Sequence, residues 1–185
     1  LVLEDDFIIS NKIFKSVKYI ENEIDDYKNK NKELILKLGC IPFYLTKKNS
    51  KFNYILASTG THAIIYNKKS IKNIYKNKLI KNDIDCDISL NNFNKVLSYK
   101  TPLIYQTFPE TENQLKWGTS NDNYLLNVIM GFFAQNVMKN LFIFHNLHIK
   151  EEPGTTHFYK YGNVYSIVFI FILLFLIYNV IILIY

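Results

Sequence analysis

An uncharged apolar segment fills the C-terminal end of the chain, from Val164 to Tyr185, and it constrains the fold more than any other feature. Ser166 and Asn179 carry its only strongly polar side chains. The segment meets the ~20-residue length that a helix needs to cross a bilayer. A buried core helix is the alternative, but a helix that is apolar on every face has too little protein around it in a chain of 185 residues. The sequence therefore predicts a C-terminal transmembrane helix.

The residues before this segment predict how it sits in the membrane. Tyr159, Tyr161 and Tyr165 lie where an aromatic belt at the membrane interface is expected. Lys150 and Lys160 precede the segment, and no charged residue follows it. By the positive-inside rule, we expect a single-pass membrane protein whose soluble domain faces the cytoplasm.

Length and composition limit the number of domains, the binding partners and the cellular compartment expected for the rest of the chain. Its length allows one domain with a core or a piece of a larger one. Because the sequence begins with Leu inside an apolar run, we expect an N-terminally truncated fragment. The net charge of +6 comes from scattered lysines without arginine, which argues against a nucleic-acid partner. Cys40 and Cys86 form no metal-binding motif, and two cysteines favour a reducing compartment over a disulfide framework.

The first part of the chain alternates between helical and extended patterns. An apolar stripe at spacings of three and four predicts a helix after Ser10: Ile13, Val17, Ile20, Ile24 and Tyr27. A strand is expected at 33–39, stopped by Gly39 and Pro42, followed by a strand at 54–57. Residues 58–62 are expected to break that strand before 63–66 resumes it. A short helix capped by Asn67, with Ile71, Ile74 and Tyr75 inward, and a strand at 102–106 complete an α/β layered domain.

A second apolar helical pattern runs from Asp122 to about Phe144. Asn127, Gln135 and Lys139 interrupt it, so it predicts a helix on the core or along a membrane surface rather than a span. Core packing is the favoured interpretation.

Three acids, Glu4, Asp5 and Asp6, end the apolar run that opens the chain. Gathering them at the edge of a core costs several kcal/mol unless a cation neutralises them. Paired carboxylates suit Mg²⁺ or Mn²⁺, especially when a diphosphate completes the coordination shell. An acidic N-cap on the following helix is the alternative.

Four separated segments together resemble glycosyltransferase family 25, which includes lipopolysaccharide-biosynthesis and procollagen galactosyltransferases. They are Leu-Val-Leu-Glu-Asp-Asp at the start, Gly60-Thr61-His62-Ala63-Ile64-Ile65-Tyr66, Ile84-Asp85-Cys86-Asp87-Ile88 and Pro102-Leu103-Ile104-Tyr105-Gln106-Thr107. The similarity extends from Leu1 to about Trp117. It implies an α/β fold, the C-terminal part of a GT-A-like (Rossmann-like) domain at 1–120, followed by a helical membrane-proximal segment at 121–163 and the transmembrane helix at 164–185.

The same resemblance implies an activity. Such a domain transfers a hexose, galactose or glucose, from a UDP-sugar donor to a glycan or protein acceptor, with inversion and with Mn²⁺ or Mg²⁺. Glu4, Asp5 and Asp6 match the family's acidic motif for metal and donor. Gly60 and His62 fall in a segment that similar proteins place near the donor. Asp85 matches a later aspartate associated with activity.

Chemistry gives each matched residue a role and an alternative. Inversion needs a carboxylate that accepts the proton of the acceptor hydroxyl; Asp85 is preferred and Asp87 is second. Both aspartates are alternatively solvated or helix caps. His62 offers a nitrogen to the cation, although a histidine after Gly-Thr is more often hydrogen-bonded in a turn. Trp117 stacks on an acceptor sugar in one interpretation and belongs to the core or the membrane interface in the other.

Two other functional classes compete with an enzyme. The first is a non-catalytic, membrane-anchored remnant of the fold that acts in binding or assembly, which follows if the family's upstream portion is absent. The second is a receiver-like signalling domain, which needs an aspartate at the end of the strand at 33–39. Gly39 and Cys40 stand there instead, so this class is disfavoured.

Overall fold

The structure is a computed structural model and describes residues 1–3, 7–76, 96–108, 128 and 131–184. In this part of the chain, helices flank a mixed sheet and one long helix ends the polypeptide. The predicted α/β class and the apolar C-terminal helix are therefore confirmed. The GT-A-like classification and the three domain boundaries stay predictions.

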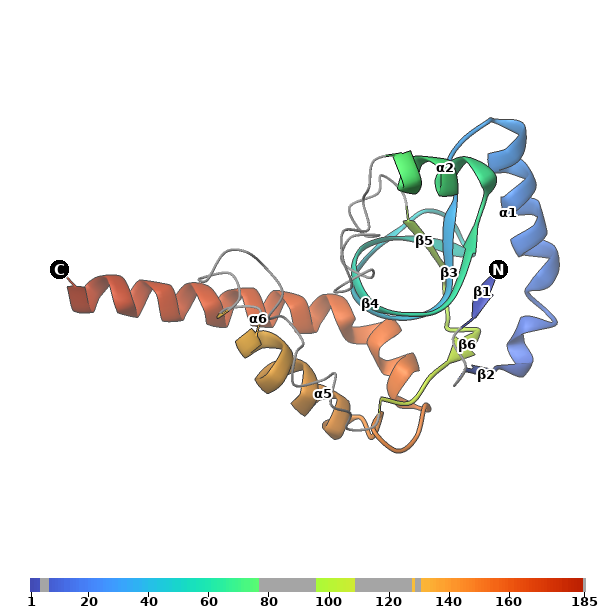
Figure 1. Cartoon of the computed structure of the whole chain (residues 1–185). Coiled ribbons are helices and arrows are strands. Elements are labelled where there is room, and N and C mark those ends of the chain that lie inside the picture. Colours follow the sequence, from blue (N-terminus) through green and yellow to red (C-terminus); the bar gives the residue numbers. More distant parts are fainter. Residues whose placement is uncertain (4–6, 77–95, 109–127, 129–130, 185) are drawn as a thin grey trace.

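The main sheet has four strands in the order β1-β4-β3-β5. They are β1 (Val2–Leu3), β3 (Ile35–Lys47), β4 (Phe52–Tyr66) and β5 (Val96–Tyr99). β4 runs antiparallel to β1 and β3, whereas β5 runs parallel to β3. Because β5 also pairs with the start of β4, the long β3–β4 hairpin is strongly curled (Figure 1). A separate pair joins β2 (Ile8–Ile9) to β6 (Ile104–Tyr105).

The two long strands correct the predicted strand ends. β3 continues through Gly39 and Pro42, and β4 continues through residues 58–62. The β3–β4 register shifts on both sides of Gly39 and again after Pro42, so β-bulges absorb these residues without ending the strand. β5 was not predicted at all, and the strand predicted at 102–106 is reduced to β6.

Helix α1 (Val17–Asn29) covers one face of the sheet. Ile20 and Tyr27 are buried there, as the apolar stripe predicted, while Val17 is exposed. Ser10 does cap a helical turn, since its hydroxyl accepts from the Lys12 amide, but this turn is a separate 3₁₀ turn, η1 (Asn11–Ile13), and α1 begins only at Val17.

Helix α2 (Lys68–Lys76) begins as predicted at Asn67, whose Oδ1 accepts a hydrogen bond from the Ser70 amide. Its predicted inward face is only partly right. Ile74 packs against the core, but Ile71 and Tyr75 are exposed, and Ser70 is the buried residue.

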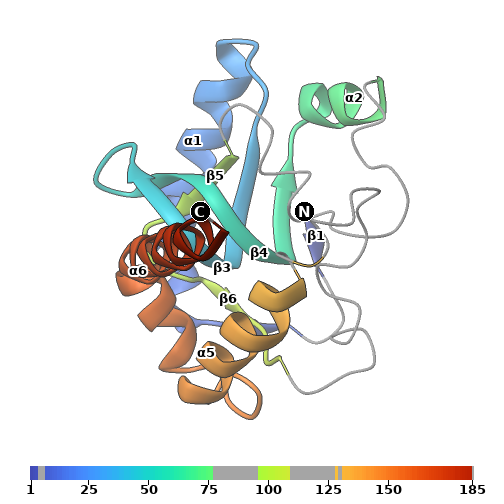
Figure 2. The same ribbon diagram turned by 90° about the vertical axis from the view of Figure 1, so that its left-hand side faces the viewer.

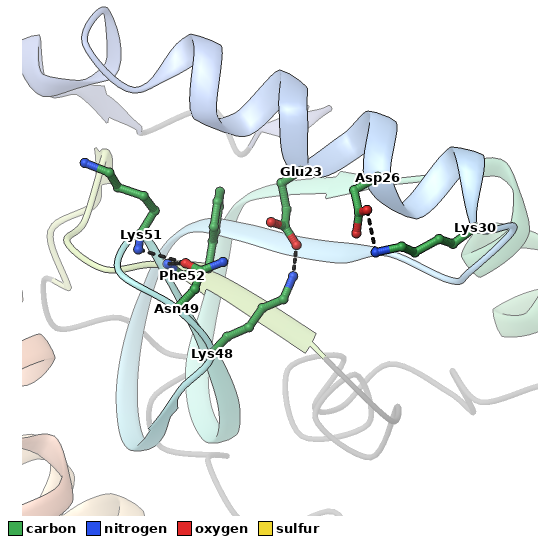
Figure 3. Close-up of polar contacts among 7 residues, drawn as sticks. All are labelled: Glu23, Asp26, Lys30, Lys48, Asn49, Lys51 and Phe52. Carbon is green, nitrogen blue, oxygen red and sulfur yellow. Dashed lines mark hydrogen bonds and ion pairs between the residues drawn. The ribbon is translucent and has the colours of Figure 1, made fainter.

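An ion pair ties α1 to the β3–β4 turn. Lys48 from the turn pairs with Glu23 from α1, and both side chains are largely shielded from solvent (Figure 3). The Lys48 ammonium also lies 4.7 Å from the centre of the Tyr27 ring. Burial lowers the pKa of Lys48 and raises the pKa of Tyr27 to about 12. The turn is therefore held against α1 by both charge and aromatic contact.

The C-terminal helix α6 (Gly154–Ile184) begins ten residues before the predicted span and docks on β3. The Asn163 side chain donates to the carbonyl and accepts from the amide of Leu45, both at 2.8 Å. Ser166 donates to the carbonyl of Phe43 at 2.7 Å. These side chains satisfy backbone groups of β3, so the start of α6 belongs to the folded domain.

Beyond the docked part, α6 leads away from the domain as a single exposed rod (Figures 1 and 2). The 26 residues Gly154–Asn179 are long and apolar enough to cross a membrane. The predicted aromatic belt needs one correction. Tyr159 packs against the core and its hydroxyl lies 3.5 Å from the Cys40 sulfur, because α6 is still docked at this position.

The described part of the predicted helix at 122–144 forms η3 (Phe133–Met138), a π-helical stretch, and α5 (Lys139–Phe144). Met138 and Phe142 are buried in a third apolar cluster with Ile41 and Phe158. Part of this helix therefore packs on the core, as favoured above.

Candidate functional site

His62 lies within β4. Its side chain is fully buried, with no exposed area, and its ring meets Phe108 edge-on at 6.3 Å between centroids. The predicted turn is wrong, because residues 58–62 are part of a continuous strand. A metal ion or donor could reach this imidazole only through the protein interior.

Two glycines make the niche that holds the His62 ring. A Cβ at Gly60 would lie 3.1 Å from His62 Nδ1, and a Cβ at Gly39 would overlap the other side of the ring and the Ile104 carbonyl. Gly60 also has φ of +84°, a conformation that residues with a side chain rarely adopt. Gly60 and Gly39 thus serve the close packing of β3, β4 and β6 around one histidine.

The segments that flank the predicted acids are both anchored at this niche. Before the acids, Leu3 of β1 pairs with Ala63, the residue after His62. After them, Ile8 of β2 pairs with Tyr105 of β6. Glu4, Asp5 and Asp6 themselves lie outside the described residues, so their contacts are not assigned.

A backbone hydrogen bond reinforces the second of these anchors. The amide of Ser10, the residue after β2, donates to the carbonyl of Leu103, the residue before β6, at 2.9 Å. Tyr105 of β6 is buried, and burial, followed by the Glu152 carboxylate, raises the pKa of its hydroxyl to about 12.

The other candidate residues are not placed. Asp85, Asp87 and Trp117 lie outside the described residues, as does Cys86. In the part of the chain that is described, no group of three or more His, Cys, Asp or Glu side chains could hold a metal ion. The structure thus brings Gly60 and His62 together and leaves the acids to be tested by experiment.

One buried polar pair escaped the sequence analysis. Lys37 of β3 is fully buried, and its ammonium donates to the Ser58 hydroxyl of β4 at 3.0 Å. The signal was present, because Lys37 interrupts an otherwise apolar run from Leu34 to Leu38. A buried ammonium needs such a partner, so the pair helps to fix the β3–β4 register.

The described residues of the site therefore show how the strands around His62 are positioned, and they include no group that is seen to bind a metal ion or a substrate. Comparison of the chain with protein-family models, with curated proteins and with solved structures finds no match.

Proposed function

We propose that this chain is a membrane-tethered, metal-dependent glycosyltransferase that moves a hexose from a UDP-sugar to a glycan or protein acceptor with inversion. The observation that carries the proposal is that motif segments distant in the sequence lie close together in the structure. Three of the four segments that resemble glycosyltransferase family 25 are far apart in sequence, yet the described parts of two of them pair as β1 and β4, and the Ile104 carbonyl of the third lies beside Gly39 at the His62 niche.

The pairing has a specific form that favours a site over a chance likeness. The residue before the acids pairs beside His62, and the segment after them pairs with Tyr105. The two flanks of one acidic triplet are thus held by two different motif segments. A functional triplet requires such support, since carboxylates must be positioned rigidly to bind a cation.

The acids would hold the cation in this proposal. Glu4, Asp5 and Asp6 supply hard oxygen ligands that suit Mn²⁺ or Mg²⁺, whereas His62 is enclosed and acts as a positioning residue. When bound, the cation would neutralise charge that develops on the nucleoside diphosphate leaving group.

The acceptor side would need one further carboxylate. Asp85 accepts the proton of the acceptor hydroxyl in this mechanism, and Asp87 is the second candidate, because inversion proceeds by direct attack from the face opposite the leaving group. The i, i+2 spacing of the two aspartates lets only one face the site if the segment is extended.

The membrane tether is the best-supported part of the proposal. α6 is long and apolar enough to span, and its docked first turns hold the domain next to the bilayer. Lys150 and Lys160 precede the exposed apolar part of α6, which favours a cytoplasmic domain.

The test uses the full-length protein, including any sequence that precedes Leu1, in detergent or nanodiscs with Mn²⁺ and UDP-galactose or UDP-glucose. We expect turnover of a UDP-sugar by the wild type and none by Asp6→Ala, because removing a ligand removes the cation. Asp25→Ala, an exposed carboxylate on α1, is the matched control and should keep wild-type turnover.

Two results would contradict the proposal. Wild-type turnover by correctly folded Asp6→Ala would remove the acids from the metal site. Absence of turnover in the wild type with every donor would favour the non-catalytic remnant.

A further inference from the structure

The surface beside the base of α6 is apolar and is not covered by the domain. Phe132, Ile143 and Phe144 are 56%, 42% and 77% exposed. They belong to one helical segment, residues 131–144, which includes η3 and α5. We call this segment the collar helix.

The collar helix is attached to α6 rather than separate from it. Its buried side chains Met138 and Phe142 share an apolar cluster with Phe158 of α6, and Tyr165 packs on the same cluster. The Phe142 and Phe158 rings meet edge to face at 5.7 Å. Figure 1 shows α5 alongside α6 at the end of the domain from which α6 leads away.

The exposed part of α6 is apolar, like the exposed surface of the collar helix. Immediately past the docked part of α6, apolar side chains become exposed: Ile167, Val168, Ile170, Phe171, Ile172 and Leu174. If the exposed part of α6 spans a bilayer, the bilayer surface contacts the elements that pack where this part of α6 begins. The collar helix lies there, in addition to β3.

Two asparagine side chains of the collar helix donate to carbonyls within the helix. The Asn136 side chain donates to the Phe132 carbonyl at 3.2 Å, and Asn140 donates to the Asn136 carbonyl. Asn179 in the exposed part of α6 does the same, donating to the Phe175 carbonyl at 2.7 Å. Internal satisfaction lowers the cost of placing an amide away from water.

We propose that the collar helix lies in the interfacial layer of the membrane spanned by α6, with Phe132, Ile143 and Phe144 against lipid. The occupant of this surface is the bilayer itself, because α6 brings it to the same place. The inference rests on the membrane span and is independent of transferase activity.

The consequence is a domain held at two points. α6 alone would leave the tilt of the domain relative to the bilayer free, whereas a second helix in the interface fixes which side of the domain faces the membrane. The His62 niche would then keep one orientation toward an acceptor in or near the bilayer.

Tryptophan fluorescence in brominated lipid tests the proposal. The chain has one tryptophan, so Trp117→Phe gives a background for single reporters at Phe132→Trp and Phe144→Trp in the full chain. Phe14→Trp is the matched control, since Phe14 is 78% exposed and lies next to α1, which Figure 1 shows on the opposite side of the sheet from α6. Ile177→Trp reports the span itself.

In vesicles of phosphatidylcholine brominated at shallow or deep acyl positions, we expect Phe132→Trp and Phe144→Trp to show blue-shifted emission and to lose most fluorescence to the shallow bromines. Phe14→Trp should keep its fluorescence, and Ile177→Trp should lose it. Blue-shifted but unquenched emission at both collar positions would mean that protein covers this face, and would overturn the proposal. So would emission like that of Phe14→Trp, or an unquenched Ile177→Trp, which would remove the span.

Discussion

At the scale of single residues, the fold depends on close approaches that only glycine permits. Gly39 brings β3 against the Ile104 carbonyl and the His62 ring, and Gly60 takes a positive φ beside the same ring. The niche leaves no room for a side chain on either strand.

We expect Gly39→Ala to lower the free energy of unfolding by about 2–3 kcal/mol, because the new methyl group must displace a backbone carbonyl. Gly60→Ala should cost about 1–2 kcal/mol from backbone strain. Thermal unfolding in detergent measures both. A Gly39→Ala protein as stable as wild type would show that His62 is not enclosed as described.

The Glu23–Lys48 pair makes a second prediction at this scale. Lys48→Met should destabilise the fold by about 1–3 kcal/mol, because it leaves a largely buried carboxylate without its cation (Figure 3). Adding Glu23→Leu to that variant should recover most of the loss. Two additive losses in this double-mutant cycle would mean that the pair does not interact.

His145 predicts how stability depends on pH. Burial, and then the charge of His157, lower the pKa of His145 below its usual 6.5, and its Nδ1 lies 3.2 Å from His157 Nδ1. The folded state therefore favours the neutral ring, whereas the unfolded chain binds a proton at higher pH. This contribution to stability is fully present above about pH 6.5 and is lost as the pH falls toward the lowered folded pKa.

Melting temperatures measured from pH 8 to pH 5 should fall for the wild type and fall less for His145→Gln. Tyr165→Phe is the control, because it removes the 2.9 Å contact with His145 Nε2 but keeps the titrating ring. The same pH slope in His145→Gln and wild type would assign the effect to another group.

At the scale of elements, the sequence predicted the helices whose pattern of apolar or capping residues lies within the helix itself. The stripe of α1, the Asn67 cap of α2 and the apolar run of α6 each follow from neighbouring residues. Strand ends were mispredicted because Gly39, Pro42 and Gly60 usually end strands, and only the partner strand shows that they form bulges instead. The burial of His62 and Tyr159 likewise depends on distant segments, which a single sequence does not reveal.

The docking of α6 on β3 can be tested as an element. Asn163→Ala removes both hydrogen bonds to Leu45 and should cost about 1–2 kcal/mol of stability. Asn179→Ala, the same change in the exposed part of α6, should cost less, because its single bond lies within the helix. Equal effects on the melting temperature would mean that Asn163 does not hold the domain to α6.

At the scale of the whole molecule, the fold joins a curled mixed sheet to a helix that continues out of the domain. The described parts of three motif segments meet at one niche, and the helix begins within the same domain. Of the predicted site, Gly60 and His62 are placed together, while the acids and Asp85 fall outside the described residues. The central claim is therefore that Glu4, Asp5 and Asp6 bind a cation beside this niche.

Direct measurement of Mn²⁺ binding tests that claim. The electron paramagnetic resonance signal of free Mn²⁺ is followed while the full-length protein is added, with and without UDP. We expect the wild type to reduce the free Mn²⁺ signal, more strongly with UDP. Asp6→Ala should not reduce it, and Asp25→Ala should behave as wild type. A wild type that leaves the free Mn²⁺ signal unchanged in the presence of UDP would contradict this claim.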